Sequence, residues 1–333
     1  MTIGINRGLI AALAFLALTG ALAVHQLAVS TADAAKLKLV NDASLTLSQS
    51  NESPRAVVEC PGKLKPYGGA QSASPPPAGD GEGVYPHSYE RLGAQDGFHS
   101  TPVLFDPPPF TNTRAYTVKL QVKCGKKPGK IADPHDIALN VPSGTTVTLE
   151  AKCAKKSVLI GGGFQRAAFE FAGGVYPSSS FATSKKTWTA TGTAFGSIRN
   201  DFVSIGYCLA SPKRKPLIKA VESTVAVSPG QVGFTTTPSC SGGRKMVWSG
   251  FDMNPKTGGH AQNAMLFADG IFNDDQSFTA SAFNGTRGVG TLTAYGYCMK
   301  DKVIGGGLKK FSKKVGNIDR EGVGEDQDGN PNG

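Results

Sequence analysis

The stretch VPSGTTVTLEAKCAKKSVLIGGGFQ at residues 141–165 returns in altered form as VSPGQVGFTTTPSCSGGRKMVWSGFD at residues 227–252. In both stretches a cysteine follows a turn proline by 11 residues, and a Gly-Phe pair follows the cysteine by 10 and 11 residues. The two cysteines, Cys153 and Cys240, lie 87 residues apart. Several matches at one spacing are the signature of a repeat architecture, so the sequence predicts duplicated modules.

Each module also ends on a cysteine. Gly-Tyr-Cys closes the second copy at Cys208 and the third copy at Cys298. A more divergent first copy contains Cys60 and Cys124, and it keeps a Gly-Gly pair at 68–69 after its first cysteine. The chain is therefore predicted to contain three copies of one module.

The copies divide the chain into five segments. We expect a leader at 1–34 and repeats at 35–128, 129–215 and 216–302, followed by a basic and then acidic tail at 303–333. The first repeat contains two proline-rich insertions. Extra length on a repeat scaffold usually forms surface loops, and we expect it there.

Residue patterning within the copies has a period of two. Residues 145–152, 188–194 and 291–297 alternate and are rich in Thr, Val, Tyr and Phe, which favour strands. The sequence thus predicts an all-β protein with five or six short antiparallel strands per repeat. Two arrangements fit this prediction: three sheets around a shared pseudo-threefold core, as in a β-prism, or three small β-sandwiches in line. Strand-like segments between the copies favour a single body.

The cysteines indicate disulfides. Their number is even, and no Cys-x-x-Cys motif suggests a metal or redox site. Because each copy begins and ends with a cysteine, the simplest pairing is within copies, and pairing between copies is the alternative. The predicted bonds within copies are Cys60–Cys124, Cys153–Cys208 and Cys240–Cys298.

The first 34 residues predict export. Arg7 precedes an apolar run at 8–24, and the small residues of Ala32-Asp33-Ala34 suit cleavage by a signal peptidase. An uncleaved anchor is the alternative, because the apolar run is slightly long. With cleavage, we expect a secreted or cell-surface protein without a transmembrane segment.

Basic residues cluster directly after the second cysteine of each copy. The chain carries a net charge of +10, and the acidic tail makes the body more basic still. Such a field attracts anionic polymers, although ordinary solubilising charge is the simpler explanation. Aromatic residues are not interleaved with these clusters, so we predict no specific nucleic-acid recognition. The candidate anion-binding residues are Lys126, Lys127, Lys130, Lys213, Arg214, Lys215, Lys300 and Lys302.

No catalytic or cofactor motif stands out. The sequence lacks a Gly-x-Ser-x-Gly elbow and any histidine spacing typical of a metal site, so we predict no catalytic residue, cofactor or metal. His87 and His99 in the first repeat are the nearest candidates for an acid–base pair. We therefore expect a non-enzymatic binding or structural protein of the cell envelope that contacts a glycan or anionic polymer. The alternative is a secreted hydrolase with a site in the loops of the first repeat.

The motif order also resembles known families. A Val-Pro-Gly turn, a cysteine, Gly-Gly-Gly-Phe, Trp-Thr-Ala-Thr and Gly-Tyr-Cys together resemble a repeat of secreted proteins from high-GC Gram-positive bacteria. The Cys…Gly-Phe…Cys order is loosely similar to the three-fold β-prism repeats of the vitelline membrane outer layer protein. These resemblances cover residues 40–300 and imply an exported β-repeat protein, with no function or catalytic residue to transfer.

Overall fold

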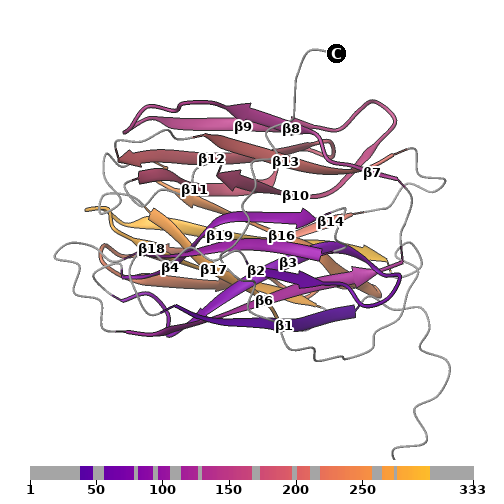
Figure 1. Ribbon diagram of the computed structural model, residues 1–333, viewed down its shortest axis with the longest axis horizontal. Coiled ribbons are helices and arrows are strands. Elements are labelled where there is room, and N and C mark those ends of the chain that lie inside the picture. Colours follow the sequence, from indigo (N-terminus) through magenta and orange to yellow (C-terminus); the bar gives the residue numbers. More distant parts are fainter. Residues whose placement is uncertain are drawn as a thin grey trace, which may run out of the picture.

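The computed structural model describes the chain between residues 38 and 300 with several gaps. The described ranges are 38–47, 56–78, 82–92, 97–105, 114–126, 130–166, 173–196, 201–210, 218–256, 265–273 and 276–300. The predicted leader and tail lie outside them. Within these ranges every regular element is a strand, which confirms the predicted all-β class (Figure 1).

Each repeat contributes a similar series of strands. The first repeat forms β1 (Lys38–Leu47), β2 (Ala56–Glu59), β3 (Lys65–Ser74), β4 (Gly83–Leu92), β5 (Gly97–Phe105) and β6 (Tyr116–Gly125). The second forms β7 (Ile131–Ala132), β8 (His135–Ala138), β9 (Thr146–Lys152), β10 (Val158–Arg166), β11 (Gly173–Ala182), β12 (Thr187–Gly196) and β13 (Phe202–Leu209). The third forms β14 (Lys219–Val227), β15 (Val232–Thr236), β16 (Arg244–Asn254), β17 (Met265–Asn273), β18 (Ser277–Asn284) and β19 (Gly290–Lys300).

The strands form three antiparallel sheets, and each sheet is shared by two repeats. The orders are β1-β6-β3-β17-β18-β15, β2-β5-β4-β10-β13-β7 with β8 also on β13, and β14-β19-β16-β11-β12-β9. Every repeat therefore divides its strands between two of the three sheets. The arrangement is cyclic, as a pseudo-threefold body requires. It corresponds to the first of the two predicted arrangements and not to sandwiches in line.

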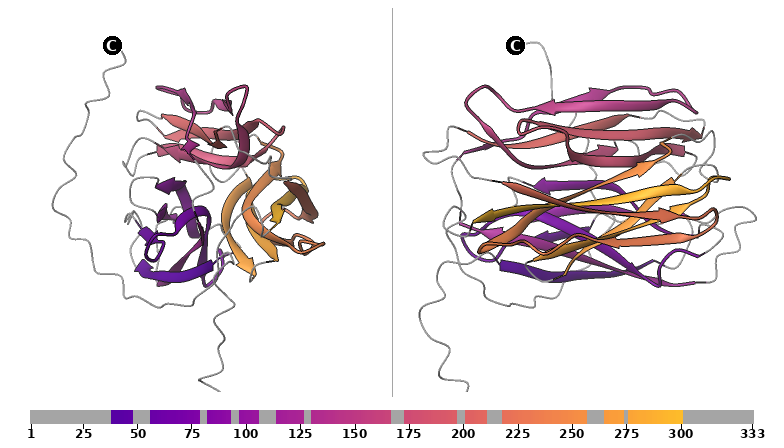
Figure 2. Two further views of the ribbon diagram at one scale, coloured as in Figure 1. Left: turned by 90° about the vertical axis from the view of Figure 1, so that its right-hand side faces the viewer. Right: turned by 180° about the vertical axis from the view of Figure 1, so that it is seen from behind.

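We call the two half-sheets of one repeat a lobe. Seen along the strands, three lobes surround a common centre (Figure 2, left). The junction strands β3–β17, β4–β10 and β11–β16 lie in the middle of their sheets. One buried hydrophobic cluster includes residues of all three repeats. The repeats thus share a single core and do not fold as separate beads.

The same irregularity marks the strand that follows the first cysteine of every repeat. Registers shift between Pro66 and Gly68 in β3, between Leu159 and Gly161 in β10, and between Met246 and Trp248 in β16. Each bulge lies opposite the second cysteine of its own repeat. Gly68, Gly161 and Trp248 follow these bulges and therefore occupy equivalent positions.

Those three equivalent residues meet at the centre. A Cβ atom on Gly161 would lie 2.5 Å from Trp248 Cδ2, and one on Gly68 would lie 2.7 Å from Trp248 Cε3. The Trp248 side chain is only 1% exposed. One large ring from the third repeat thus fills space that the first two repeats leave open by using glycine. This packing explains why the Gly-Gly pair is retained in two copies and replaced in the third.

The tyrosine of the Gly-Tyr-Cys motif links neighbouring lobes. The Arg91 backbone N–H donates to the Tyr207 hydroxyl at 2.6 Å, and the Ala182 N–H donates to the Tyr297 hydroxyl at 2.7 Å. At the third junction the Phe272 N–H donates to the Gln121 side-chain carbonyl at 2.7 Å. Burial raises the pKa of both tyrosines well above the ordinary value, so the phenols stay protonated.

Replacing Tyr297 by phenylalanine should therefore lower the free energy of unfolding by about 1–3 kcal/mol, because it leaves the Ala182 N–H without its acceptor. Denaturant titration of the oxidised protein would measure the change. Tyr295→Phe on the same strand is the matched control and should cost less than about 0.5 kcal/mol. Equal effects of the two substitutions would contradict a junction role for the Tyr297 hydroxyl.

The structure contains three disulfides, and they join the pairs that the pairing within copies predicts. They are Cys60–Cys124, Cys153–Cys208 and Cys240–Cys298. In each pair the first cysteine follows a strand of one sheet and the second lies within a strand of another. Each bond therefore ties two different sheets inside one lobe. Within the described ranges the structure has no helix with the length and apolar character that a membrane crossing needs.

Candidate functional site

The three disulfides lie at the same end of the body. In each repeat one strand, β3, β10 or β16, starts soon after the first cysteine, and the next strand, β4, β11 or β17, returns toward that end. Strands of these two kinds pair antiparallel between repeats, as β3 with β17, β10 with β4 and β16 with β11. A strand that leaves one disulfide thus lies beside a strand that approaches the next. This geometry places the matching turns of all three lobes together.

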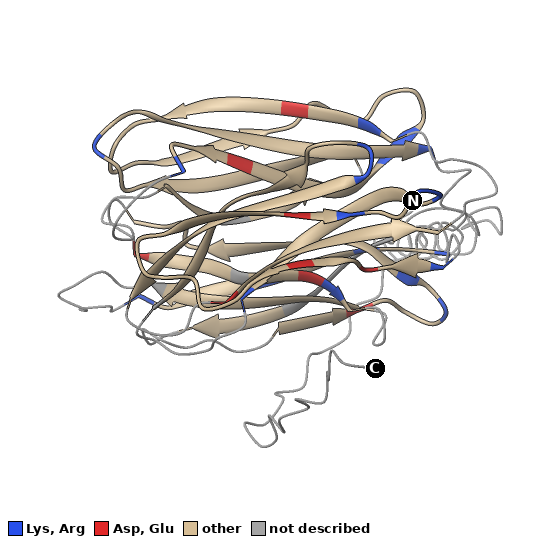
Figure 3. Ribbon diagram, turned by 90° about the horizontal axis from the view of Figure 1, so that it is seen from above, with Lys and Arg blue, Asp and Glu red and all other residues tan. Residues whose placement is uncertain are grey.

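This end is rich in lysine, and we call it the basic end. Figure 3 shows most of the blue segments toward one end of the strands. The described basic residues in its turns and near its strand termini are Lys63, Lys65, Arg91, Lys126, Lys130, Lys152, Lys155, Lys156, Lys185, Lys186, Lys219, Arg244, Lys245 and Lys300. The described acidic residues nearest to it are Glu59, Glu90, Asp133 and Glu150. The basic end therefore carries an excess of positive charge.

The structure places the predicted anion-binding residues only in part. Three of them are exposed at the basic end. Lys126 directly follows β6, Lys130 directly precedes β7, and Lys300 is the last residue of β19. The other predicted members lie outside the described residues: Lys127, Lys213, Arg214, Lys215 and Lys302. The three described members come from different repeats and lie at this one end.

Sequence reasoning missed the turn lysines. Lys155-Lys156 follows Cys153, and Lys185-Lys186 connects β11 to β12. All four are exposed. A signal was present, because each pair occupies a short polar segment between two alternating strands. Only the pairing of β9 with β12 and of β10 with β13, together with the Cys153–Cys208 bond, shows that these turns lie at the same end as the Gly-Tyr-Cys segment of their repeat.

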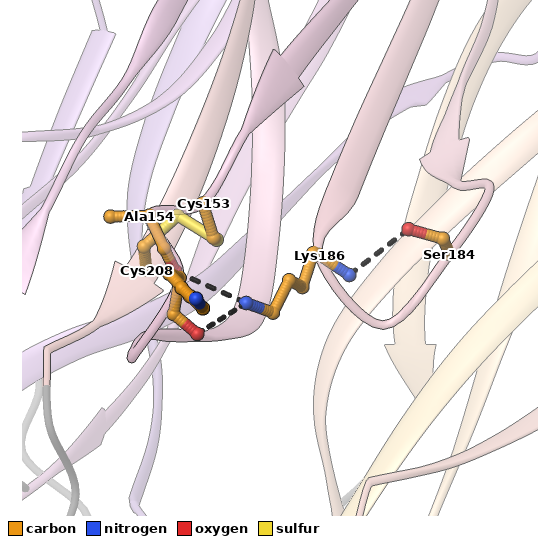
Figure 4. Close-up of a disulfide and its surroundings, with 6 residues drawn as sticks. Cys153, Ala154, Ser184, Lys186 and Cys208 are labelled. Atoms are coloured by element: carbon orange, nitrogen blue, oxygen red, sulfur yellow. Dashed lines mark hydrogen bonds between the residues drawn. A yellow bond between two sulfur atoms is a disulfide. The ribbon is translucent and has the colours of Figure 1, made fainter.

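Backbone contacts hold the turns near the Cys153–Cys208 disulfide (Figure 4). The Lys186 ammonium donates to the carbonyl oxygens of Ala154, at 3.3 Å, and of Lys155. The Lys186 N–H donates to the Ser184 hydroxyl at 3.1 Å. Lys186 thereby joins the turn after β9 to the turn before β12, which fixes the positions of the neighbouring lysines.

A buried tyrosine fixes the chain where it leaves β6. The Tyr67 hydroxyl donates to the Lys126 carbonyl at 2.7 Å, and burial raises the Tyr67 pKa far above its ordinary range. Lys152 is exposed and forms an ion pair with Glu150 at 2.8 Å, which raises the pKa of Lys152. Lys152 thus stays charged at neutral pH. Both lysines lie at the rim of ordered strands.

The first repeat contains a separate buried polar network. His99 lies on β5, and its Nδ1 is 2.8 Å from Glu90 Oε1 while its Nε2 is 3.0 Å from Thr101 Oγ1. The Ser88 hydroxyl donates to Thr101 Oγ1 at 2.9 Å. Ser88 and Thr101 are each 2% exposed, so the hydroxyl–imidazole–carboxylate chain is enclosed. His87 lies on β4, and its side chain is outside the described part of the structure.

The registers show that this network is particular to the first repeat. The pair Glu90–His99 is equivalent to Phe181–Thr189 in the second repeat and to Ile271–Thr279 in the third. Nearby, the Arg91 guanidinium donates to the Pro66 carbonyl at 3.0 Å and lies 3.5 Å from Asp133. Burial raises the pKa of Asp133, and Arg91 partly offsets this effect.

The described residues show no cluster of three or more His, Cys, Asp or Glu side chains that could hold a metal ion. Among the carboxylates, the buried Asp201 accepts a hydrogen bond from the Asn140 N–H at 2.7 Å, which is a turn contact. The adjacent Asp274 and Asp275 lie outside the described residues. Unlike these carboxylates, the basic end contains side chains from every lobe.

Comparison with known proteins adds little. No family model matches the chain, and no curated protein matches it. One solved structure, described as "The Triple Jelly Roll Fold and Turret Assembly in an Archaeal Virus", aligns with 84% of this chain and 92% of its own. The identity is 11% and the TM-score is 0.17, a value too low to argue for a common fold.

Proposed function

We propose that the protein is a secreted, non-enzymatic protein of the cell envelope that binds an anionic polymer through its basic end. The observation that carries this proposal is the placement of exposed lysines from all three lobes at one end of the strands. A rigid body with one strongly basic end attracts and orients a polyanion. Binding and retention, rather than chemistry, follow most directly from such a surface.

Three internal disulfides support the proposed export. Disulfides form and persist mainly in oxidising compartments, and the described cysteines are all paired. The motif order also resembles repeats of secreted proteins from high-GC Gram-positive bacteria, and we propose kinship with them. An envelope location would place the basic end among anionic wall polymers.

The enclosed His99 network offers less support for the alternative of a hydrolase. A nucleophilic hydroxyl needs access to its substrate, and Thr101 and Ser88 are both buried in the described structure. The hydrogen bonds of His99 satisfy Glu90 and Thr101, which is how buried polar groups stabilise a fold. We therefore assign this network a structural role in the proposed function.

Salt dependence tests the proposal. Binding of the purified protein to poly(glycerol phosphate) resin should weaken steadily with added salt, because bound lysines release counterions. Replacing Lys155 and Lys300 by glutamine should reduce the affinity about 10-fold or more at low salt.

The matched control replaces Lys119 and Arg287, which are exposed away from the basic end, by glutamine. This variant should keep nearly the full affinity. Absence of binding at low salt, or binding that salt does not weaken, would refute an electrostatic polymer-binding function. Equal losses in the two variants would refute the assignment to the basic end.

A further inference from the structure

We infer that the ligand is a linear phosphodiester polymer that lysines of at least two lobes hold at once, so that polymer length sets the affinity. This inference rests on the proposed function and specifies its ligand. It follows from the distribution of the lysines over three lobes of one rigid body and from the scarcity of free guanidinium groups among the described residues of the basic end.

Every lobe contributes its own exposed lysines. In the first lobe they lie in the turn after β2 and after β6, in the second lobe in the turns after β9 and β11, and in the third lobe at the start of β14 and the end of β19. The residues are, lobe by lobe, Lys63 and Lys126, then Lys155, Lys156 and Lys185, then Lys219 and Lys300. The pseudo-threefold arrangement therefore repeats a positive patch around one end.

One patch alone is a weak site. An exposed lysine that meets an anion contributes little to the binding free energy, because water and salt screen the charge and the side chain loses freedom. These lysines lie on separate turns, and the Lys186 ammonium already donates to backbone carbonyls. A small anion that contacts one lobe should therefore bind weakly.

A polymer that reaches a second lobe gains an intramolecular contact. The lobes share sheets and one core, so no flexible linker dilutes the second contact. Joining two weak contacts in this way increases affinity by about 100-fold to 10,000-fold when the ligand spans both sites. The affinity should thus rise steeply once the polymer is long enough to contact two lobes.

Lysine side chains suit a ligand that carries single negative charges at intervals along its chain. Arginine forms two parallel hydrogen bonds to a carboxylate or a terminal phosphate, whereas lysine acts as a point charge. At the basic end, the Arg244 guanidinium donates to the Ser241 carbonyl at 3.3 Å, and Arg91 is held by Pro66 and Asp133. The exposed groups of the described turns are lysines. They suit a chain of monoanionic phosphodiesters.

Calorimetric titration with polymers of defined length tests the inference. The probes are synthetic poly(glycerol phosphate) of about 3 and about 30 units, inorganic phosphate, and hyaluronate matched in charge number to the longer polymer. The long phosphodiester should bind at least about 100-fold tighter than the short one. Inorganic phosphate should show no binding at millimolar concentration, and hyaluronate should bind more weakly than the long phosphodiester.

A variant that lacks the lysines of one lobe distinguishes the effect of polymer length from the effect of total charge. Replacing Lys155, Lys156 and Lys185 by glutamine removes the patch of the second lobe, and the advantage of the long polymer over the short one should shrink about 10-fold. Equal binding of short and long phosphodiesters would overturn the inference but leave the proposed function standing. Hyaluronate binding as tightly as the phosphodiester would overturn the ligand assignment alone. No binding of any polymer would overturn the proposed function as well.

Discussion

Replacing Trp248 by alanine should lower the free energy of unfolding by about 4 kcal/mol, because the ring fills the centre where the three repeats meet. Its side chain is buried over Gly68 and Gly161. It also makes an edge contact with Tyr207, at 4.9 Å between ring centroids, and with Phe98, at 6.5 Å. Equilibrium denaturation with the disulfides intact would measure the loss. Phe234→Ala is the control, since Phe234 is 53% exposed.

A double-mutant cycle identifies the cause of this loss. Gly161→Ala places a methyl group where the Trp248 ring lies, so it should destabilise the protein strongly on its own. In the Trp248→Ala background the methyl group has room, and the cost of Gly161→Ala should fall by about 1–3 kcal/mol. Strictly additive effects would contradict the shared occupation of the centre by one ring and two glycines.

Removing one disulfide should have a similarly large effect. Replacing Cys153 and Cys208 together by alanine should cost on the order of 4 kcal/mol, because the bond closes a loop with a sequence separation of 55. The other two bonds close separations of 64 and 58, so their removal should cost nearly the same. Thermal and denaturant unfolding of the three double variants would test this equality.

The topology adds a condition to that prediction. Because every bond ties two different sheets, loss of any one should weaken the whole body and not only its own lobe. A single cooperative transition should therefore persist in each variant at a lower midpoint. A separate early transition of one lobe would contradict the shared core.

Much of the fold was predictable from local patterns. Alternating residues indicate strands because successive side chains in a strand point to opposite faces. The repeated Cys…Gly-Phe…Gly-Tyr-Cys order predicted equivalent modules, and the matching register shifts at Leu159–Gly161 and Met246–Trp248 agree with it. These features depend on neighbours in the chain, so a single sequence reveals them.

The candidate site was predictable only in part. Lysines after the second cysteines were visible as charge clusters, whereas Lys155 and Lys185 belong to turns in other parts of the second repeat. Nothing in their spacing states that strands of neighbouring repeats pair antiparallel. That pairing depends on contacts between residues far apart in the chain, such as Phe164 with Tyr89.

The amino-acid pattern alone thus predicted the strand content, the module length and the disulfide pairing within each copy. The sharing of each sheet by two repeats, the single indole at the centre and the gathering of lysines from three lobes emerged only from long-range packing. The physical reason is that period and propensity act over a few residues. The pairing of half-sheets between repeats instead depends on close packing around the central axis. The Trp248 ring fits at this axis only because Gly68 and Gly161 leave room for it.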